Sequence, residues 1–161
     1  METPKSLEDF IKIIQLTPRS IISEGDRRRI AAVMSFDGRK VIDLMKTKDE
    51  MVFVGQDEIL GPLTLDKLYK SGFKNFPVVD ARGKVIGVLN TSALNDLSVR
   101  EAEKAGKYMD GNVNYLHTSD SLNFAAEEIS RTGGYYFLVL NSSEQLVGFF
   151  TVEMLLNYLI G

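Results

Sequence analysis

The sequence contains no cysteine and only one histidine, His117, among its 161 residues. Without cysteine the chain can form neither a disulfide nor a thiolate metal site, and it has no cysteine nucleophile. A single imidazole excludes metal sites built from several histidines, and a Ser/His/Asp triad would depend on His117 alone. The chain is therefore poor in the side chains that most enzymes use for catalysis.

An excess of positive charge and long apolar runs are also lacking. Lysine and arginine number 19 against 22 aspartates and glutamates, which gives a net charge of −3. A nucleic-acid-binding face needs concentrated positive charge, so no nucleic-acid partner is expected. The longest apolar runs, such as 135–140, fall well short of the roughly 20 residues of a membrane-spanning helix. The chain itself is therefore not expected to insert into a membrane.

The first part of the chain has helical patterns. Apolar residues recur with helical spacing between Leu7 and Ile14, and Pro18 marks the end of that helix. A second apolar stripe runs from Ile30 to Met34, and Gly38 is expected to close it. These patterns predict a helical leader over residues 1–44.

From residue 54 onward the chain aligns with itself at an offset of 61 residues without a gap. Residues 76–80 fall on 137–141, residues 85–89 fall on 146–150, and Gly72 falls on Gly133. Because the glycines and the apolar positions repeat together, the pattern indicates an internal duplication.

Each copy has the pattern of a strand, a helix, two strands joined by a turn, and a last helix. The two strands beside the turn are apolar at nearly every position, which indicates that both of their faces are covered. The leading strands and helices are expected at Met51–Val54 and Leu63–Lys70, at Val113–Leu116 and Leu122–Arg131, and the last helices from Thr91 and Val152.

This element order, with Phe76–Asp80 before the turn and Val85–Leu89 after it, resembles the cystathionine-β-synthase (CBS) motif. Two such motifs in tandem resemble a CBS pair, or Bateman module. The resemblance implies an α/β (α+β) fold in which two motifs pack with pseudo-two-fold symmetry. The implied boundaries are a leader at 1–44, motif 1 at 45–104 and motif 2 at 105–161, with 45–161 forming one module.

The flanking segments narrow the resemblance. Residues 22–26, 30–34 and 41–45 are similar to the stretch that joins the membrane domain to the CBS pair in the CorC/CNNM (haemolysin-C-like) family. Residues 155–161 resemble the end of that family's second motif. Members of the family are associated with magnesium and cobalt transport.

The resemblance implies regulation and no enzymatic activity. It implies a homodimer in the cytoplasm, on the cytosolic face of the membrane, that acts on the membrane domain of a parent transporter. The implied ligand is an adenine nucleotide (ATP, ADP or AMP), alone or with Mg²⁺, and no metal site made by the chain's own side chains is implied.

The family's phosphate-and-ribose motif is Gly, two apolar residues, Thr or Ser, two variable residues, then Asp. In the first copy Asn90 takes the hydroxyl position and Ala93 the Asp position, whereas the second copy keeps Thr151 but has Met154 for the Asp. Asn75 also stands where the family often has Arg. The missing carboxylates remove the usual contact with ribose, so the second copy offers the better nucleotide cleft.

The candidate residues of that second-copy cleft are Thr151, Tyr136 and Leu116. Each singled-out position has a structural alternative. Thr151 is equally suited to capping the following helix, and Tyr136 to packing on a pleated sheet. His117 fits a polar residue at the edge of a strand better than a catalytic or metal-binding one.

Two alternatives to the nucleotide sensor remain open. The first is a ligand-free dimerisation module whose clefts are filled by Phe149, Phe150 and Met154. The second is a stand-alone cytosolic CBS-pair protein, which differs only in its attachment. No pair of carboxylates has the pattern of a general acid and base, so the sequence indicates no catalytic residue.

Overall fold

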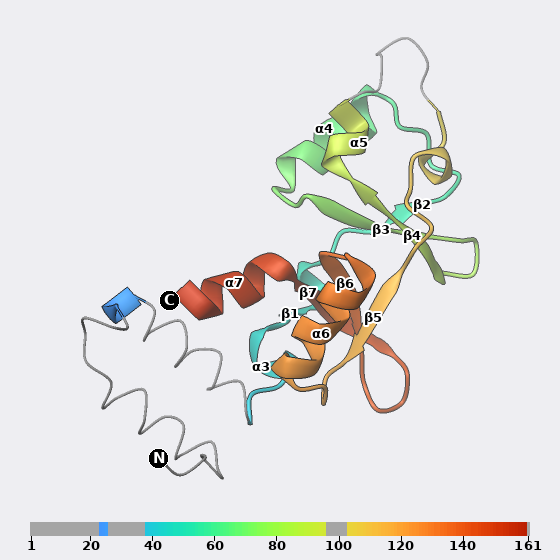
Figure 1. The fold of residues 1–161 in the computed structure, drawn as a ribbon. Helices are drawn as coiled ribbons and strands as arrows, with labels where there is room; N and C mark the ends of the chain where they lie inside the picture. The colour runs from blue at the N-terminus through green and yellow to red at the C-terminus, as the bar shows by residue number, and fades with distance from the viewer. Residues whose placement is uncertain (1–22, 26–37, 96–102, 161) are drawn as a thin grey trace, which may run out of the picture.

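The computed structural model describes residues 23–25, 38–95 and 103–160 (Figure 1). The expected helices at Leu7–Ile14 and Ile30–Met34 lie outside the described residues. The described helices are α3 (Val41–Leu44), α4 (Pro62–Lys70), α5 (Thr91–Asn95), α6 (Leu122–Thr132) and α7 (Val152–Ile160). The strands are β1 (Lys46–Thr47), β2 (Val54–Gly55), β3 (Asn75–Val79), β4 (Val85–Asn90), β5 (Asn114–His117), β6 (Tyr136–Leu140) and β7 (Leu146–Thr151).

Both copies have the predicted order of strand, helix, strand, strand and helix. The first copy runs β2, α4, β3, β4, α5, and the second runs β5, α6, β6, β7, α7. In each copy the first strand pairs in parallel with the second, and the last two strands form an antiparallel hairpin. The mixed α/β fold class is therefore confirmed.

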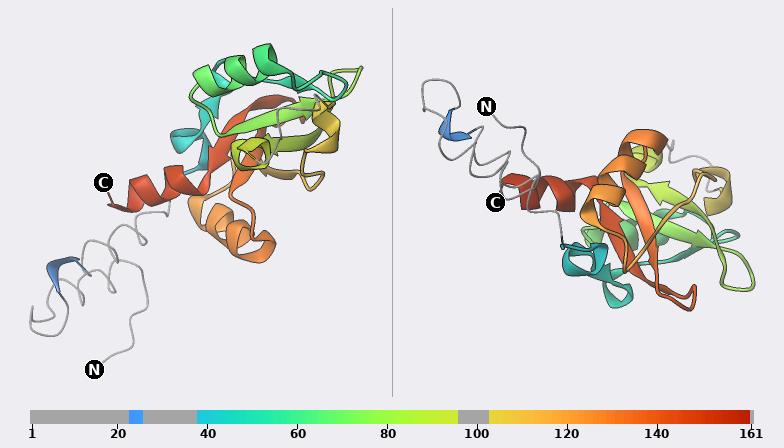
Figure 2. Two further views of the ribbon diagram at one scale, coloured as in Figure 1. Left: turned by 90° about the horizontal axis from the view of Figure 1, so that it is seen from above. Right: turned by 60° about the horizontal axis from the view of Figure 1, so that its bottom comes forward.

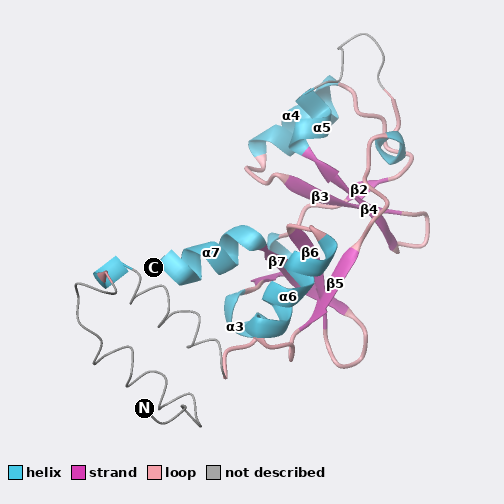
Figure 3. Ribbon diagram, in the orientation of Figure 1, coloured by secondary structure: helices cyan, strands magenta, loops and turns pink. Residues whose placement is uncertain are grey.

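The strands form a three-stranded sheet in the order β2-β3-β4 and a four-stranded sheet in the order β1-β7-β6-β5. The two sheets lie side by side in the middle of the molecule, with α4 and α5 outside one and α3 and α6 outside the other (Figure 3). Helix α7 projects from the body in every view (Figure 2).

Apolar residues cover both faces of the strands, as their composition predicts. Phe76, Val78 and Leu89 pack towards the helices of the first copy, and Phe137, Val139 and Phe150 towards those of the second. The alternate residues Tyr136, Leu138 and Phe149 form a third cluster with residues of the first copy, including Phe73 and Val88. This third cluster joins the two motifs.

Each sheet is completed by the segment that leads into the other copy. Strand β1 lies before β2, the first strand of the first copy, yet it pairs with β7 of the second copy, with Lys46 opposite Phe149. In the first motif, Val88 and Asp110 form the corresponding antiparallel bridge, with N–H···O distances of 2.9 and 2.8 Å. The two motifs are thus interlocked by their leading segments.

The leading segment of the first motif differs from the prediction. A strand was expected over Met51–Val54, but β2 contains only Val54 and Gly55, and Lys48–Glu50 forms a 3-10 turn. The reason is that β1 is already paired with the other sheet, so residues 48–53 serve as the connection back to the first motif.

The repeat also contains a one-residue shift that the ungapped alignment misses. Val54 pairs with Val78 in the first copy, and Leu116 pairs with Val139 in the second. Val78 and Val139 are 61 positions apart, whereas Val54 and Leu116 are 62 apart. The first copy therefore contains one more residue than the second copy between its first and second strands.

The hairpin turns are built alike in both copies. The Asp80 Oδ1 accepts hydrogen bonds from the N–H groups of Arg82 and Lys84, at 2.9 and 3.0 Å. Its counterpart Asn141 does the same for residues 143 and 145. Asp80 therefore has a structural role, because a short side chain that binds the backbone two residues on stabilises a turn.

Candidate functional site

Two cavities of similar size lie where the two motifs meet. The first has a volume of about 310 Å³ and is called here the Thr151 cavity; its lining includes Lys46, Lys74, Tyr136, Thr151 and Met154. The second has a volume of about 370 Å³ and is called the Asn90 cavity; its lining includes Asn75, Asn90, Asp110, Tyr135 and Tyr136.

The duplication relates these cavities to each other. Thr151 of one cavity corresponds to Asn90 of the other, and Lys74 corresponds to Tyr135, in each case at the offset of 61. Asn75 and Tyr136 also correspond to each other, and both residues line both cavities. The two cavities are therefore the two equivalent clefts of the repeat.

Thr151 lies at the end of β7, directly before α7. Its Oγ1 accepts a hydrogen bond of 3.2 Å from the N–H of Met154, so Thr151 caps the helix. The capping role is thus present, and the hydroxyl also borders the Thr151 cavity. Among the described residues, no hydrogen bond donated by this hydroxyl is recorded.

Tyr136 lies directly opposite Thr151 in the antiparallel pair of β6 and β7. Its ring is stacked on Phe149, with the ring centroids 5.4 Å apart, and only 8% of the residue is exposed. Little ring area is left to stack on a base, so packing against the sheet explains the ring. Burial also raises the pKa of the phenol well above its ordinary value, so the hydroxyl stays protonated at a pH where an exposed tyrosine would ionise.

Leu116 does not reach either cavity with its side chain. The residue is completely buried in the core of the second copy, together with Phe137 and Phe150. Successive residues of a strand point to opposite faces of the sheet, so Phe137 faces away from Tyr136. Leu116 lies opposite Val139, which shares the face of Phe137. The structure thus brings Tyr136 and Thr151 together and places the side chain of Leu116 behind the sheet.

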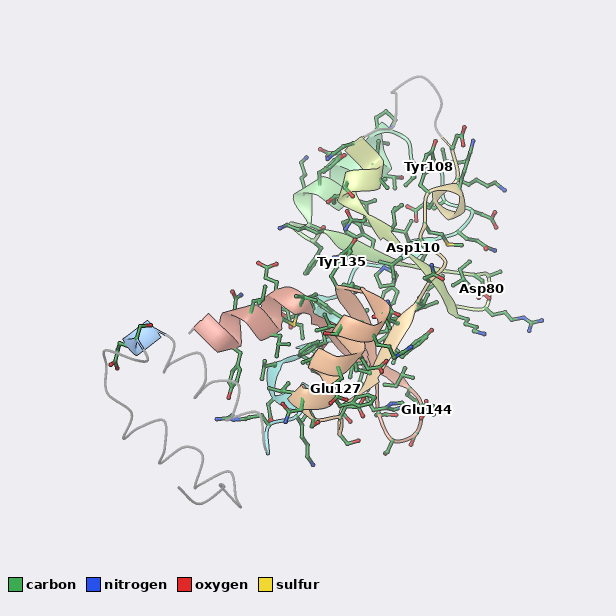
Figure 4. All side chains as sticks on the ribbon, in the orientation of Figure 1. Asp80, Tyr108, Asp110, Glu127, Tyr135 and Glu144 are labelled. Carbon is green, nitrogen blue, oxygen red and sulfur yellow. The ribbon has the colours of Figure 1, made fainter. Side chains whose placement is uncertain are left out.

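In the first copy, Asn75 and Asn90 lie opposite each other, and their side chains are joined by a hydrogen bond. Asn90 Nδ2 donates to Asn75 Oδ1 at 2.9 Å and to the Tyr135 hydroxyl at 3.1 Å. Asn90 Oδ1 accepts from both the N–H and the hydroxyl of Ser92. Tyr135 and Asp110, both labelled in Figure 4, border the same cavity. Both the Nδ2 and the Oδ1 of Asn90 are therefore hydrogen-bonded within the protein.

The side chains around the Thr151 cavity carry two positive charges and one negative charge. Lys46 comes from the exchanged strand β1, Lys74 precedes β3, and Glu153 lies in the first turn of α7. Lys46 is only loosely paired, with its Nζ 3.9 Å from a Glu50 oxygen. Sequence reasoning missed Lys46 because its place in this cavity depends on the pairing of β1 with the second motif.

His117 lies at the hairpin end of the second copy, away from both cavities. Its Nε2 is 2.8 Å from an oxygen of Glu144, and its backbone N–H donates to Asp120 at 2.7 Å. This is the polar position at a strand edge that the sequence indicates. Across residues 23–25, 38–95 and 103–160, no group of three or more acidic or histidine side chains is arranged to hold a metal ion.

None of the helices in the described part of the chain is long and apolar enough to span a bilayer. Within the same part, two larger hollows of about 600 and 580 Å³ border Gln56 and Tyr115, respectively. Neither hollow contains Thr151 or Tyr136. Thr151 and Tyr136 therefore belong to the smaller cavities between the motifs, whereas Leu116 lines neither of them.

The comparison with family models matches residues 105–161 to the CBS domain. No curated protein sequence matches the chain. The CBS domain of a bacterial CNNM/CorC family Mg²⁺ transporter is a similar solved structure, with 18% identity, a TM-score of 0.83 and coverage of 98% of each chain.

Two further solved structures are similar. A CBS domain of the bacterial CNNM/CorC family Mg²⁺ transporter in complex with ATP has 17% identity and a TM-score of 0.74, and covers 84% of this chain and 97% of its own. A hemolysin-like protein containing a CBS domain from Oenococcus oeni PSU has 17% identity and a TM-score of 0.70, with 82% and 98% covered. At these identities the likeness shows the fold, and the predicted resemblance to CBS domains of this group is confirmed.

Proposed function

We propose that this chain is a regulatory CBS-pair module that binds an adenine nucleotide in the Thr151 cavity. The observation that carries the proposal is that the hydroxyls of Thr151 and Tyr136, neither of which donates a hydrogen bond within the described residues, belong to residues that line a cavity with two lysines. The fold is shared with a CBS domain solved with ATP. The volume of about 310 Å³ lies at the lower end of the range for small-molecule sites.

The groups around the cavity suit the phosphate part of such a ligand. The ammonium groups of Lys46 and Lys74 attract anionic oxygens, and the Thr151 hydroxyl lies at the N-terminus of α7, which favours negative charge. A Mg²⁺ ion bound with the nucleotide would be held through the phosphates, because the cavity contributes only one carboxylate, that of Glu153.

The cavity suits the ribose of such a ligand less well than its phosphates. Met154 occupies the position where a carboxylate is expected, and its thioether is a weak acceptor. Loss of a charged hydrogen bond costs about 1.5–3 kcal/mol. The module would therefore bind adenine nucleotides more weakly than a CBS pair that keeps this carboxylate.

We place the module on the cytosolic side of a CorC/CNNM-like magnesium or cobalt transporter, where it dimerises and passes ligand state to the membrane domain. We expect the dimer to cover some of the apolar residues exposed on the outer helices, such as Leu63 on α4, Phe124 on α6 and Leu156 on α7. Sedimentation velocity of the isolated chain tests the dimer. Several spans of roughly 20 apolar residues in the parent gene would establish the membrane attachment.

A ligand-free dimerisation module is the competing function, and the closed Asn75–Asn90–Tyr135 contact favours it for the first copy. Phe150 does not fill a cleft as that alternative assumed, because it is fully buried on the opposite face of its sheet. Phe149 and Met154 do line the Thr151 cavity. They narrow it but leave an open volume.

Calorimetric titration with ATP, ADP and AMP, each with and without Mg²⁺, distinguishes the two functions. Thr151→Asn gives the second copy the residue of the first, keeps a good helix cap and removes the hydroxyl. We expect about tenfold weaker ATP binding with little change in melting temperature. Thr151→Ser keeps both roles and should bind like the wild type. No heat with any nucleotide up to millimolar concentration would support the scaffold.

A further inference from the structure

The two copies differ at one equivalent cross-strand pair. Asn75 lies opposite Asn90 in the first copy, and Tyr136 lies opposite Thr151 in the second. Directly opposed residues of an antiparallel pair have Cβ atoms about 4.5–5.5 Å apart, so each pair shares one face of its sheet. The side chains of Asn75 and Asn90 share a hydrogen bond of 2.9 Å, whereas no side-chain hydrogen bond joins Tyr136 to Thr151 in the described structure.

The Tyr136 hydroxyl is the group that this difference leaves without a partner. Only 8% of the residue is exposed, and among the described residues no hydrogen bond to its hydroxyl is recorded. Buried polar groups nearly always have a partner, and each exception calls for an explanation. Tyr136 borders both cavities, and its ring packs on the sheet by stacking on Phe149.

We infer that the Tyr136 hydroxyl donates a hydrogen bond to a phosphate oxygen of the ligand in the Thr151 cavity. Tyr136 is then a specificity-determining residue that reads the anionic part of the ligand, and its ring packs on the sheet without stacking on a base. The inference rests on the proposed function and deepens it, because it assigns the recognition of phosphate to Tyr136, the counterpart of Asn75 in the second copy.

The choice of a phosphate oxygen follows from the surrounding groups. Besides Tyr136, the side-chain donors at this cavity are the Thr151 hydroxyl, the ammonium groups of Lys46 and Lys74, and the amides of Asn75 and Asn157. Glu153 supplies the one carboxylate that could instead accept from a ligand hydroxyl. A neutral phenol in such surroundings donates best to an anionic acceptor, since charge-assisted hydrogen bonds are roughly twice as strong as neutral ones.

Tyr136→Phe tests the inference because it removes only the hydroxyl and keeps the packing of the ring. Its affinity is measured by calorimetry with ATP and with adenosine, which lacks phosphate. We expect ATP binding to weaken about 5- to 10-fold, while adenosine binding changes less than about twofold. The melting temperature without ligand should stay equal or rise, because a buried hydroxyl without a partner is removed.

Tyr135→Phe is the matched control. Tyr135 is the neighbouring residue, but it is 55% exposed and its hydroxyl accepts from Asn90 in the other cavity. This variant should bind ATP like the wild type. Equal weakening by both variants would overturn the inference.

The remaining outcomes separate this inference from the proposed function. Unchanged ATP affinity in Tyr136→Phe overturns the inference and leaves nucleotide binding intact. Equal losses for ATP and adenosine also overturn it, because the hydroxyl would then contact the nucleoside. A lower melting temperature of the free variant would assign the hydroxyl a structural role and overturn the inference too. If the wild type binds neither ATP nor adenosine, both proposals fail together.

Discussion

At the scale of single residues, the repeated glycines Gly87 and Gly148 have a packing role. A side chain at Gly87 would approach the Asp110 carbonyl oxygen to 2.8 Å, and one at Gly148 would overlap the Lys46 carbonyl oxygen. In both copies the obstacle is the backbone of the segment that leads into the other copy and pairs with the strand that contains the glycine. The sequence shows that these glycines repeat. Glycine is needed at both positions because another segment of the same chain packs against it, and not because of a ligand.

Gly148→Ala should therefore lower the free energy of unfolding by about 1–3 kcal/mol, the usual cost of adding atoms to a filled space. Gly111→Ala is the control, because a side chain there meets nothing within 4 Å. Urea denaturation measures both variants. If Gly148→Ala is as stable as Gly111→Ala, β1 does not pack against β7 as described.

The raised pKa of Tyr136 predicts a pH dependence of stability. An exposed tyrosine of the unfolded chain titrates near about pH 10, and burial holds the folded phenol neutral above that. The stabilising contribution is complete below about pH 10 and is lost as the pH rises towards the raised pKa. The free energy of unfolding should then fall by up to about 1.4 kcal/mol per pH unit from this group.

The measurement is urea denaturation of the wild type and Tyr136→Phe between pH 9 and pH 11, with both pH limits chosen as about one unit around the ordinary tyrosine value. The wild type should lose stability more steeply than Tyr136→Phe, and Tyr135→Phe should follow the wild type. Parallel curves for all three proteins would contradict the burial of the Tyr136 phenol.

At the scale of elements, the helices follow their sequence signals closely. Helix α6 begins at Leu122 as predicted, with Ser121 as its cap, and ends one residue later than expected, before Gly133. Gly133 has a φ of +66°, a conformation that glycine adopts without strain. Local signals of this kind can be read directly from the chain. The strand expected at Met51–Val54 was wrong because its pairing is decided by a distant element.

Ser121→Ala tests the cap of α6. The Ser121 Oγ accepts a hydrogen bond of 3.0 Å from the N–H of Phe124, and its removal should cost about 1 kcal/mol. Thermal unfolding measured by circular dichroism gives the loss. Ser121→Asp keeps a capping oxygen and should stay close to the wild type; a loss as large as that of Ser121→Ala would point to another role for Ser121.

At the scale of the whole molecule, the two motifs depend on each other. The four-stranded sheet takes β1 from the segment that leads into the first copy, and the cluster of Tyr136, Leu138 and Phe149 is covered by residues of the first copy. Neither motif completes its sheet from its own repeat. The exchange also supplies Lys46 to the Thr151 cavity.

A fragment of residues 105–161, the span that matches the CBS domain model, should therefore not unfold cooperatively. It lacks β1 and exposes the apolar face that carries Phe149. Residues 38–161 serve as the comparison and should show one sharp transition by calorimetry. A cooperative transition of the fragment at a similar temperature would show that the motifs are independent.

The duplication, the element order, the apolar strands and the position of Thr151 at the start of a helix could all be predicted from the amino-acid sequence. These features depend on residue type and spacing along a short stretch of chain, so they can be predicted locally. The tertiary structure decided that β1 joins the other sheet, that Leu116 faces the core, that Asn90 is bonded to Asn75 and Tyr135, and that the Tyr136 hydroxyl has no partner in the described structure. Each of these depends on residues far apart in the sequence, whose contacts exist only once the two copies have packed together.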